Sequence, residues 1–181
     1  MVFGWFRRRD NPAVAALYSA IVAQARLPYF YAELRVPDTV EARFDMIVLH
    51  AVLVFRRLRG EGDTASAFGQ QVFDLFFTDM DGSLREMGVG DLSVPKKVKK
   101  MAEAFYGRAA AYSTALDNGD HDALSGALGR ILFPDTPEPI AADKIALYME
   151  QSAAALARQP VADLLAGRVT WIDPAEDGGT A

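Results

Sequence analysis

The sequence contains no cysteine and only two histidines, His50 and His121, among its 181 residues. A chain without cysteine has no disulfide framework, no thiolate metal site and no cysteine nucleophile. Long apolar runs are missing too, because the longest stretch without a charged residue is residues 11–25, and it contains Asn, Ser and Gln. A membrane-spanning helix needs about 20 predominantly apolar residues, so we predict no membrane span.

The N-terminal nine residues lack the order that is typical of a secretion signal. Apolar and aromatic residues come first and Arg7, Arg8 and Arg9 follow, whereas a signal peptide begins with its positive charges. The Arg- and Ser-rich pattern of a mitochondrial presequence is also missing. We therefore expect an unprocessed bacterial protein of the cytoplasm, with a peripheral position on the inner face of the cell membrane as the alternative.

Composition favours one soluble domain. Apolar residues make up 51% of the chain and charged residues 24%, which excludes a disordered chain. The net charge of −5 hides a gradient, since residues 1–60 carry +4, residues 61–116 carry −2 and residues 117–181 carry −7. The excess of positive charge in residues 1–60 indicates a surface for an anionic partner. An uneven spread of charge without function explains the gradient equally well.

The apolar periodicity is helical nearly throughout. Val14, Leu17, Tyr18 and Ile21 recur at spacings of three and four residues, as a buried helical stripe requires. Residues 46–55 are apolar on every side and predict a central helix. We predict an all-α, single-domain bundle of about six or seven helices with no significant sheet. A basic and aromatic arm is expected at residues 1–10, the helical domain at 11–172 and a mobile tail at 173–181.

Capping residues and helix breakers set the predicted boundaries. Helices are expected at residues 12–26, 38–59, 63–80, 93–116, 120–132, 140–157 and 161–166. Asp38 is predicted to cap the second helix, Asp81-Gly82 to end the third and Ser93 to cap the fourth. Residues 29–34 are expected to form an irregular aromatic connector, and residues 169–172 an extended segment across the surface.

Patterns that carry catalysis or bind metal are missing. The two histidines form no Glu-x-x-His or His-x-x-x-His pair, so a helical metal site has no ligand set. Asp79-Met-Asp-Gly82 resembles part of a calcium loop, but the aligned end positions are Phe77 and Gly88, which supply no side-chain oxygen. We predict no enzyme, no cofactor and no metal. His50 is interpreted as a hydrogen-bonded core residue and His121 as part of a helix-start loop.

Basic side chains form a patch with two parts, whose members are Arg7, Arg8, Arg9, Lys96, Lys97, Lys99 and Lys100. The four lysines share one broad face at a helix start, where cations oppose the helix dipole. This position indicates a partner that needs their charge, or else a solvated face partly offset by nearby acids. We expect contact with a membrane surface or a ribosome, and no specific DNA.

Three stretches in the middle of the chain form an ordered set of motifs. The first is Tyr31-Ala-Glu-Leu-Arg-Val-Pro-Asp-Thr39, followed by Arg43-Phe44, Leu49-His50 and Arg57-Leu58-Arg59. The second runs through residues 73–91, and the third combines residues 94–101 with Phe105-Tyr-Gly-Arg108. This set resembles the ubiquinol–cytochrome c chaperone family over residues 29–117.

The resemblance implies an all-helical assembly factor that holds newly made cytochrome b until haem and partner subunits are added. In mitochondrial members a small partner protein near the ribosomal exit takes part. The candidate partner-binding residues in the matched motifs are Tyr31, Asp38, Arg43, Arg57, Arg85, Asp91, Tyr106 and Arg108. For five of them the favoured interpretation is a polar staple that fixes the order of the helices, with client contact as the alternative: Asp38, Arg43, Arg57, Arg85 and Asp91.

The sequence therefore predicts a non-enzymatic assembly chaperone whose protein client is cytochrome b of ubiquinol–cytochrome c reductase. The alternative is a peripheral membrane or ribosome adaptor that binds through the basic patch. A third hypothesis is a small-ligand binder or enzyme with an interhelical pocket around His50.

Overall fold

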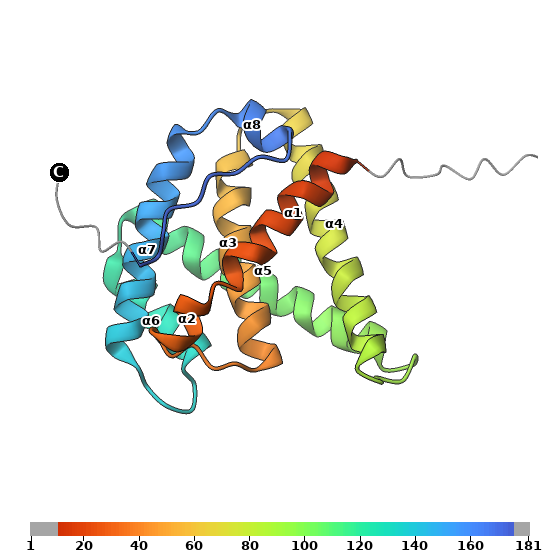
Figure 1. The fold of residues 1–181 in the computed structure, drawn as a ribbon, viewed down its shortest axis with the longest axis horizontal. Helices are drawn as coiled ribbons and strands as arrows, with labels where there is room; N and C mark the ends of the chain where they lie inside the picture. Colours follow the sequence, from red (N-terminus) through yellow and green to blue (C-terminus); the bar gives the residue numbers. More distant parts are fainter. Residues whose placement is uncertain (1–10, 176–181) are drawn as a thin grey trace, which may run out of the picture.

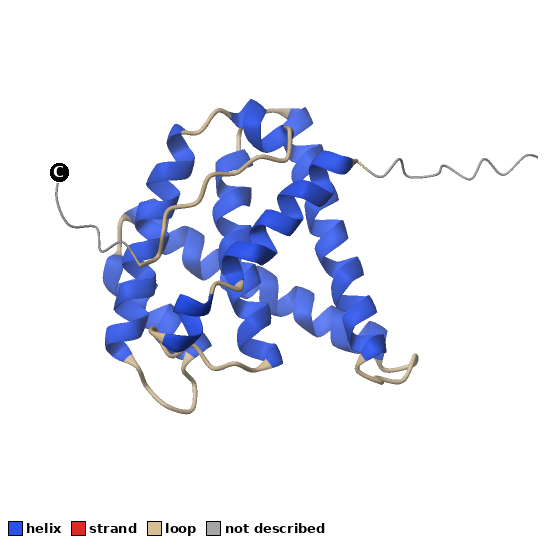
Figure 2. Ribbon diagram, in the orientation of Figure 1, coloured by secondary structure: helices blue, strands red, loops and turns tan. Residues whose placement is uncertain are grey.

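The computed structural model describes residues 11–175, and within them it contains eight helices and no strand (Figures 1 and 2). Six helices are long: α1 (Pro12–Ala25), α3 (Val40–Leu58), α4 (Asp63–Glu86), α5 (Val94–Asn118), α6 (His121–Leu132) and α7 (Pro139–Arg158). The other two, α2 (Pro28–Ala32) and α8 (Val161–Leu165), have five residues each. The predicted all-α class is confirmed. The predicted arm with Arg7, Arg8 and Arg9, and residues 176–181 of the predicted tail, lie outside the described residues.

Helix α3 forms the centre of the bundle. Thirteen of its nineteen residues are buried, and α1, α4, α5, α6 and α7 all pack against it (Figure 1). A helix that is apolar on every side is stable only when other helices surround it. The structure thus confirms the prediction that residues 46–55 lie in the central helix.

Helices α4 and α5 meet at a corner that projects from one side of the bundle, while α6 and α7 pack together on the other side (Figure 1).

After α8 the chain turns at Gly167, whose φ is +79°. A Cβ at this position would lie 2.7 Å from the carbonyl oxygen of Ala13, so only glycine fits here without strain. The chain then returns past α7 without regular structure (Figure 2). It is held there by hydrogen bonds from Gln24 Nε2 to the carbonyl oxygen of Ile172 (3.2 Å) and from the Thr170 amide to Gln159 (2.9 Å).

Two predicted helix caps are wrong. The side chain of Thr39, not Asp38, caps α3 by accepting a hydrogen bond from the Ala42 amide at 3.1 Å. Asp38 instead accepts from Arg43 Nε at 2.6 Å. Ser93 occupies the cap position of α5, but its side chain makes no capping hydrogen bond.

Two predicted boundaries also differ from the structure. Helix α4 continues through Asp81-Gly82 to Glu86, because Asp81 pairs with Arg85 one turn later at 2.6 Å and a single glycine within a helix only weakens it. The helix ends beside Gly88, whose φ is +81°. The aromatic connector contains the single-turn helix α2, with Pro28 in its first turn.

Candidate functional site

His50 lies in a closed polar network inside the bundle. Its Nδ1 contacts the carbonyl oxygen of Met46 at 2.7 Å, and its Nε2 contacts the Tyr148 hydroxyl at 2.9 Å. Gln24 Nε2 donates to the same hydroxyl at 3.0 Å. Complete burial lowers the pKa of His50 to about 4, so the ring is neutral at pH 7. The network therefore stabilises the contact between α1, α3 and α7, as predicted for a core histidine, and His50 itself has no exposed surface.

Arg108 and Asp45 form the other deep polar contact, between α5 and α3. Arg108 Nε lies 2.6 Å from a carboxylate oxygen of Asp45, whose side chain is only 4% exposed. Burial raises the pKa of Asp45 to about 6, and the nearby guanidinium acts in the opposite direction. Arg108 also stands over the ring of Phe44, 5.8 Å from its centroid. This candidate partner-binding residue is thus engaged inside the protein.

Three more candidates lie together near the start of α3. Tyr31 donates its hydroxyl hydrogen bond to the carbonyl oxygen of Ala25 at 3.0 Å, and burial raises its pKa. Asp38 and Arg43 form their ion pair on the surface, where both side chains are more than half exposed. The hydrogen bond from Arg43 lowers the pKa of Asp38.

Arg85 and Asp91 form an ion pair at the α4–α5 corner, where Arg85 Nη1 lies 2.5 Å from Asp91. Arg57 belongs to a different region, at the C-terminal end of α3, and donates two hydrogen bonds to the carbonyl oxygen of Gln159 at 3.2 and 2.9 Å. The structure therefore distributes the eight candidates over several places and does not gather them into one site.

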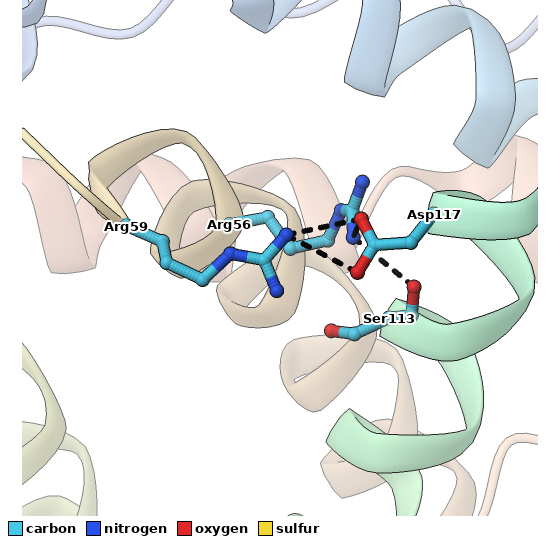
Figure 3. A network of polar contacts seen from close by, with 4 residues as sticks. All are labelled: Arg56, Arg59, Ser113 and Asp117. Carbon is cyan, nitrogen blue, oxygen red and sulfur yellow. Dashed lines mark hydrogen bonds and ion pairs between the residues drawn. The ribbon is translucent and has the colours of Figure 1, made fainter.

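Arg56 and Arg59 converge on one carboxylate from α5 (Figure 3). Arg56 Nη1 lies 2.6 Å from Asp117 Oδ1, and Arg59 Nη2 lies 3.0 Å from the same oxygen. Arg56 also donates to the carbonyl oxygen of Ser113 at 3.2 Å. Both hydrogen bonds lower the pKa of Asp117. The cluster ties the end of α3 to the end of α5.

An apolar hollow, which we call the aromatic groove, opens beside this arginine cluster. It has a volume of about 360 Å³ and is lined by residues of α3, α4 and α5. Its walls include Phe55, Phe73, Phe105 and Tyr106, and Gly69 lines it without a side chain. Tyr106 is 61% exposed, whereas Phe55 and Phe73 are half-buried.

The aromatic side chains of this groove support one another. The ring of Phe73 lies 5.2 Å from that of Phe105 in an edge-on arrangement and 5.7 Å from that of Tyr106. Such contacts hold the walls in place, and the exposed ring faces remain available for an apolar partner. Phe105 and Tyr106 belong to the same sequence motif, but the apolar periodicity does not predict that Phe105 is buried and Tyr106 is exposed.

Two other hollows are more strongly charged. One, of about 320 Å³, is lined by Arg56, Arg57, Arg59 and Glu61. The other, of about 590 Å³, combines charged lining residues such as Arg35, Glu41 and Glu138 with an apolar wall formed by Ile131, Leu132 and Phe133. Of these three hollows, the aromatic groove is the one that several aromatic rings line together, and Arg59 is its one charged lining residue.

The four lysines of the basic patch are all exposed on the first two turns of α5. The described residues contain no group of three or more His, Cys, Asp or Glu side chains that could hold a metal ion. Residues 11–175 also contain no helix that is both long and apolar enough to cross a membrane.

A family model described as ubiquinol-cytochrome C chaperone matches residues 32–171, which include the whole aromatic groove. The chain belongs to the ubiquinol–cytochrome c chaperone family. The resemblance predicted from the motif series is thereby confirmed.

The chain is also similar to animal proteins. The chain is 26% identical over 161 residues to ubiquinol-cytochrome c reductase complex assembly factor 1 of Mus musculus and 25% identical to that of Homo sapiens. These matches cover 88% of the chain but only 54% of either relative. The chain thus spans about half the length of these assembly factors.

A solved structure supports the same fold for this chaperone family. The crystal structure of the Cbp3 homolog from Brucella abortus is 41% identical and superposes with a TM-score of 0.84. The alignment covers 91% of each chain. The two chains therefore share their helical arrangement, including the helices that form the groove, over nearly all of their length.

Proposed function

We propose that this protein is a non-enzymatic chaperone for newly made cytochrome b in the assembly of ubiquinol–cytochrome c reductase. The observation that carries the proposal is the aromatic groove, on a chain of this chaperone family. An assembly chaperone needs a surface that covers apolar segments of an unassembled subunit, and it needs no reactive centre. The proposed place of work is the cytoplasm, at the inner face of the cell membrane.

The dimensions of the groove suit an anchor for part of a helix. A helix with its side chains is about 10 Å across, so a hollow of about 360 Å³ receives a few side chains from one face of a client helix. Aromatic rings provide large apolar contact with little loss of conformational freedom. The client helix would therefore rest across the opening, with Tyr106 against its side.

Charge beside the groove adds a second contact. Arg59 lines the groove and its side chain is 60% exposed. It shares Asp117 with Arg56, so two guanidinium groups face one carboxylate and a net positive charge remains. A carboxylate or helix C-terminus of the client would be attracted to this rim.

Of the eight candidate residues, Tyr106 is the one for which we propose a direct client contact. It is the candidate that lines the groove. The remaining candidates stay predictions, and their internal hydrogen bonds and ion pairs favour a role in holding the helices together.

Site-specific photocrosslinking in the native host tests the proposal. A photoreactive amino acid is placed at Tyr106 and, as the control, at Ile140, which is 74% exposed on α7. We expect a crosslink to cytochrome b from position 106 and none from position 140. A deletion strain that assembles the reductase normally would contradict the chaperone function.

Two substitutions test the groove separately from the function. Tyr106→Ser removes the exposed ring. Gly69→Leu fills the groove, because Gly69 lines it and a Cβ there would meet Leu58 Cδ1 at an ordinary contact distance of 3.6 Å. We expect both variants to retain less cytochrome b in a pull-down, and Ile140→Ser to retain as much as the unaltered protein. Equal retention by all three variants would place the client elsewhere on the chaperone.

A further inference from the structure

The α4–α5 corner (residues 87–100) exposes apolar side chains that the fold leaves uncovered. Leu92 is 99% exposed and Met87 is 53% exposed. They are two of six large apolar residues with such exposure in the described part of the chain. The corner projects away from the bundle where α4 turns into α5 (Figure 1).

The fold holds this corner in a defined shape. Leu84 and Val94, at 7% and 0% exposure, are buried beneath it. The Val89 amide donates to the carbonyl oxygen of Leu84 at 3.0 Å, and the Ser93 amide donates to that of Gly90 at 2.7 Å. Arg85 bridges Asp81 and Asp91, at 2.6 and 2.5 Å. The exposure of Leu92 is therefore imposed by an ordered turn.

Positive charge follows the exposed leucine along the chain, and the acidic neighbour Asp91 is already paired with Arg85. Residues 92–100 include Lys96, Lys97, Lys99 and Lys100 and no acidic residue. Lys99 Nζ lies 3.9 Å from Glu103, a distance that contributes little on an exposed helix. The lysines stand in the first turns of α5, where the helix dipole disfavours cations. An external anion would compensate this cost, since the protein itself does so only weakly.

We propose that the α4–α5 corner docks the protein on an anionic lipid surface. Leu92 and Met87 would enter the headgroup region, and the four lysines would face the lipid phosphates. An exposed apolar residue followed by a cluster of lysines suits an interfacial membrane contact. A convex corner with so few apolar side chains does not offer the roughly 800 Å² per partner of a stable protein interface. An RNA partner would explain the lysines but not the exposed leucine.

This docking would set the height of the aromatic groove above the membrane. Phe73 on α4 and Met87, which directly follows α4, are fourteen residues apart, or about 21 Å along the helix axis. The groove would thus face the space just outside the headgroups. The inference does not depend on the proposed client, because binding to lipid vesicles can be measured without one.

A fluorescent label at the corner provides the direct test. Because the full chain contains no cysteine, Leu92→Cys and Ile140→Cys each offer one attachment point for an environment-sensitive dye. The probe is a vesicle of equal parts phosphatidylglycerol and phosphatidylcholine. We expect a blue shift and stronger emission from position 92, no change from position 140, and no change at either position with pure phosphatidylcholine. An unchanged signal at position 92 while the protein sediments with the vesicles would overturn the proposal, since another segment, such as residues 1–9, would then carry the binding.

Charge reversal and leucine removal complete the test by vesicle sedimentation. Reversing all four lysines to glutamate should weaken binding by about a hundredfold or more, and 0.5 M salt should weaken it for the unaltered protein. Leu92→Ser should weaken binding several-fold at constant charge. The reversal places anions at a helix start, where they stabilise the helix, so a melting temperature that is not lowered shows that lost binding is not unfolding. If neither change affects sedimentation, the corner is not the lipid-binding element.

Discussion

Helices α3 and α5 pack against each other and have opposite characters. Thirteen of the nineteen residues of α3 are buried, whereas α5 buries only Val94, Phe105, Tyr112 and Ala115 among its twenty-five residues. Burial of apolar side chains supplies most of the stability of such a bundle. The stability therefore resides mainly in α3, and α5 is available to present side chains to partners.

Charges on the two helices differ in the same way. The basic residues in the last turn of α3, Arg56 and Arg57, are favoured by the helix dipole and are engaged with Asp117 and the carbonyl oxygen of Gln159. The lysines of α5 stand at the opposite, disfavoured end. A charge that already has internal partners needs no function to explain it, whereas one that weakens its own helix indicates an external partner.

The strongest test of this comparison replaces the same residue type in both regions. Leu49 in α3 is 0% exposed and Leu92, just before α5, is 99% exposed. Leu49→Ala removes packed methyl groups and leaves a cavity, so we expect it to lower the free energy of unfolding by about 2–5 kcal/mol. Leu92→Ala should change it by less than about 0.5 kcal/mol. Urea denaturation followed by circular dichroism measures both, and equal losses would contradict the assignment of stability to α3.

A second test breaks the deep ion pair between the two helices. Arg108→Ala leaves the carboxylate of Asp45 buried without its partner, and we expect a loss of about 2–4 kcal/mol. Adding Asp45→Asn removes the unpaired charge and should recover part of this loss. Lys100→Ala, on the exposed surface of the same helix, serves as the control. If Arg108→Ala costs no more than Lys100→Ala in urea denaturation, α5 is not fastened to α3 through this pair.

A third test uses the pH dependence of the α3 interior. The pKa of His50 is lowered from 6.5 to about 4 by burial. The unfolded chain therefore binds more protons than the folded one between these values, and stability falls as the pH falls through this window. From pH 7 to pH 5 the unaltered protein should lose about 2 kcal/mol more than His50→Gln does. Urea denaturation at both pH values measures this difference. Parallel losses in the two proteins would show that His50 is protonated in the folded state.

Much of this fold follows from local sequence patterns. The stripe on α1 and the all-apolar centre of α3 each predict burial from spacing alone, and both are observed. The end of α4 could not be predicted in the same way. Asp81-Gly82 is typical of a turn, but the ion pair of Asp81 with Arg85 lies within the helix and helps it to continue.

The candidate site was less predictable than the fold. Arg108 and Asp45 are sixty-three positions apart in the sequence, so only the tertiary structure shows that they are partners. Exposure raises the same difficulty, because Phe105 and Tyr106 are neighbours in one motif and yet are 3% and 61% exposed. A motif identifies the family, and the packing of three helices decides which of its aromatic residues face outward.

The starts of the two helices provide the finest comparison. The Thr39 side chain accepts a hydrogen bond from the Ala42 amide, whereas Ser93 has φ −94° and ψ −25° and makes no such bond. Thr39→Ala should therefore cost about 1 kcal/mol, and Ser93→Ala should cost close to nothing, when both are measured by thermal denaturation. Equal costs would show that Ser93 caps α5 after all. The expected difference means that α5 begins without a side-chain cap, since the Val94 amide donates to the carbonyl oxygen of Gly90 at 3.2 Å and Pro95 has no amide hydrogen. The four lysines that follow are disfavoured by the helix dipole, and their charge becomes favourable beside an anionic surface.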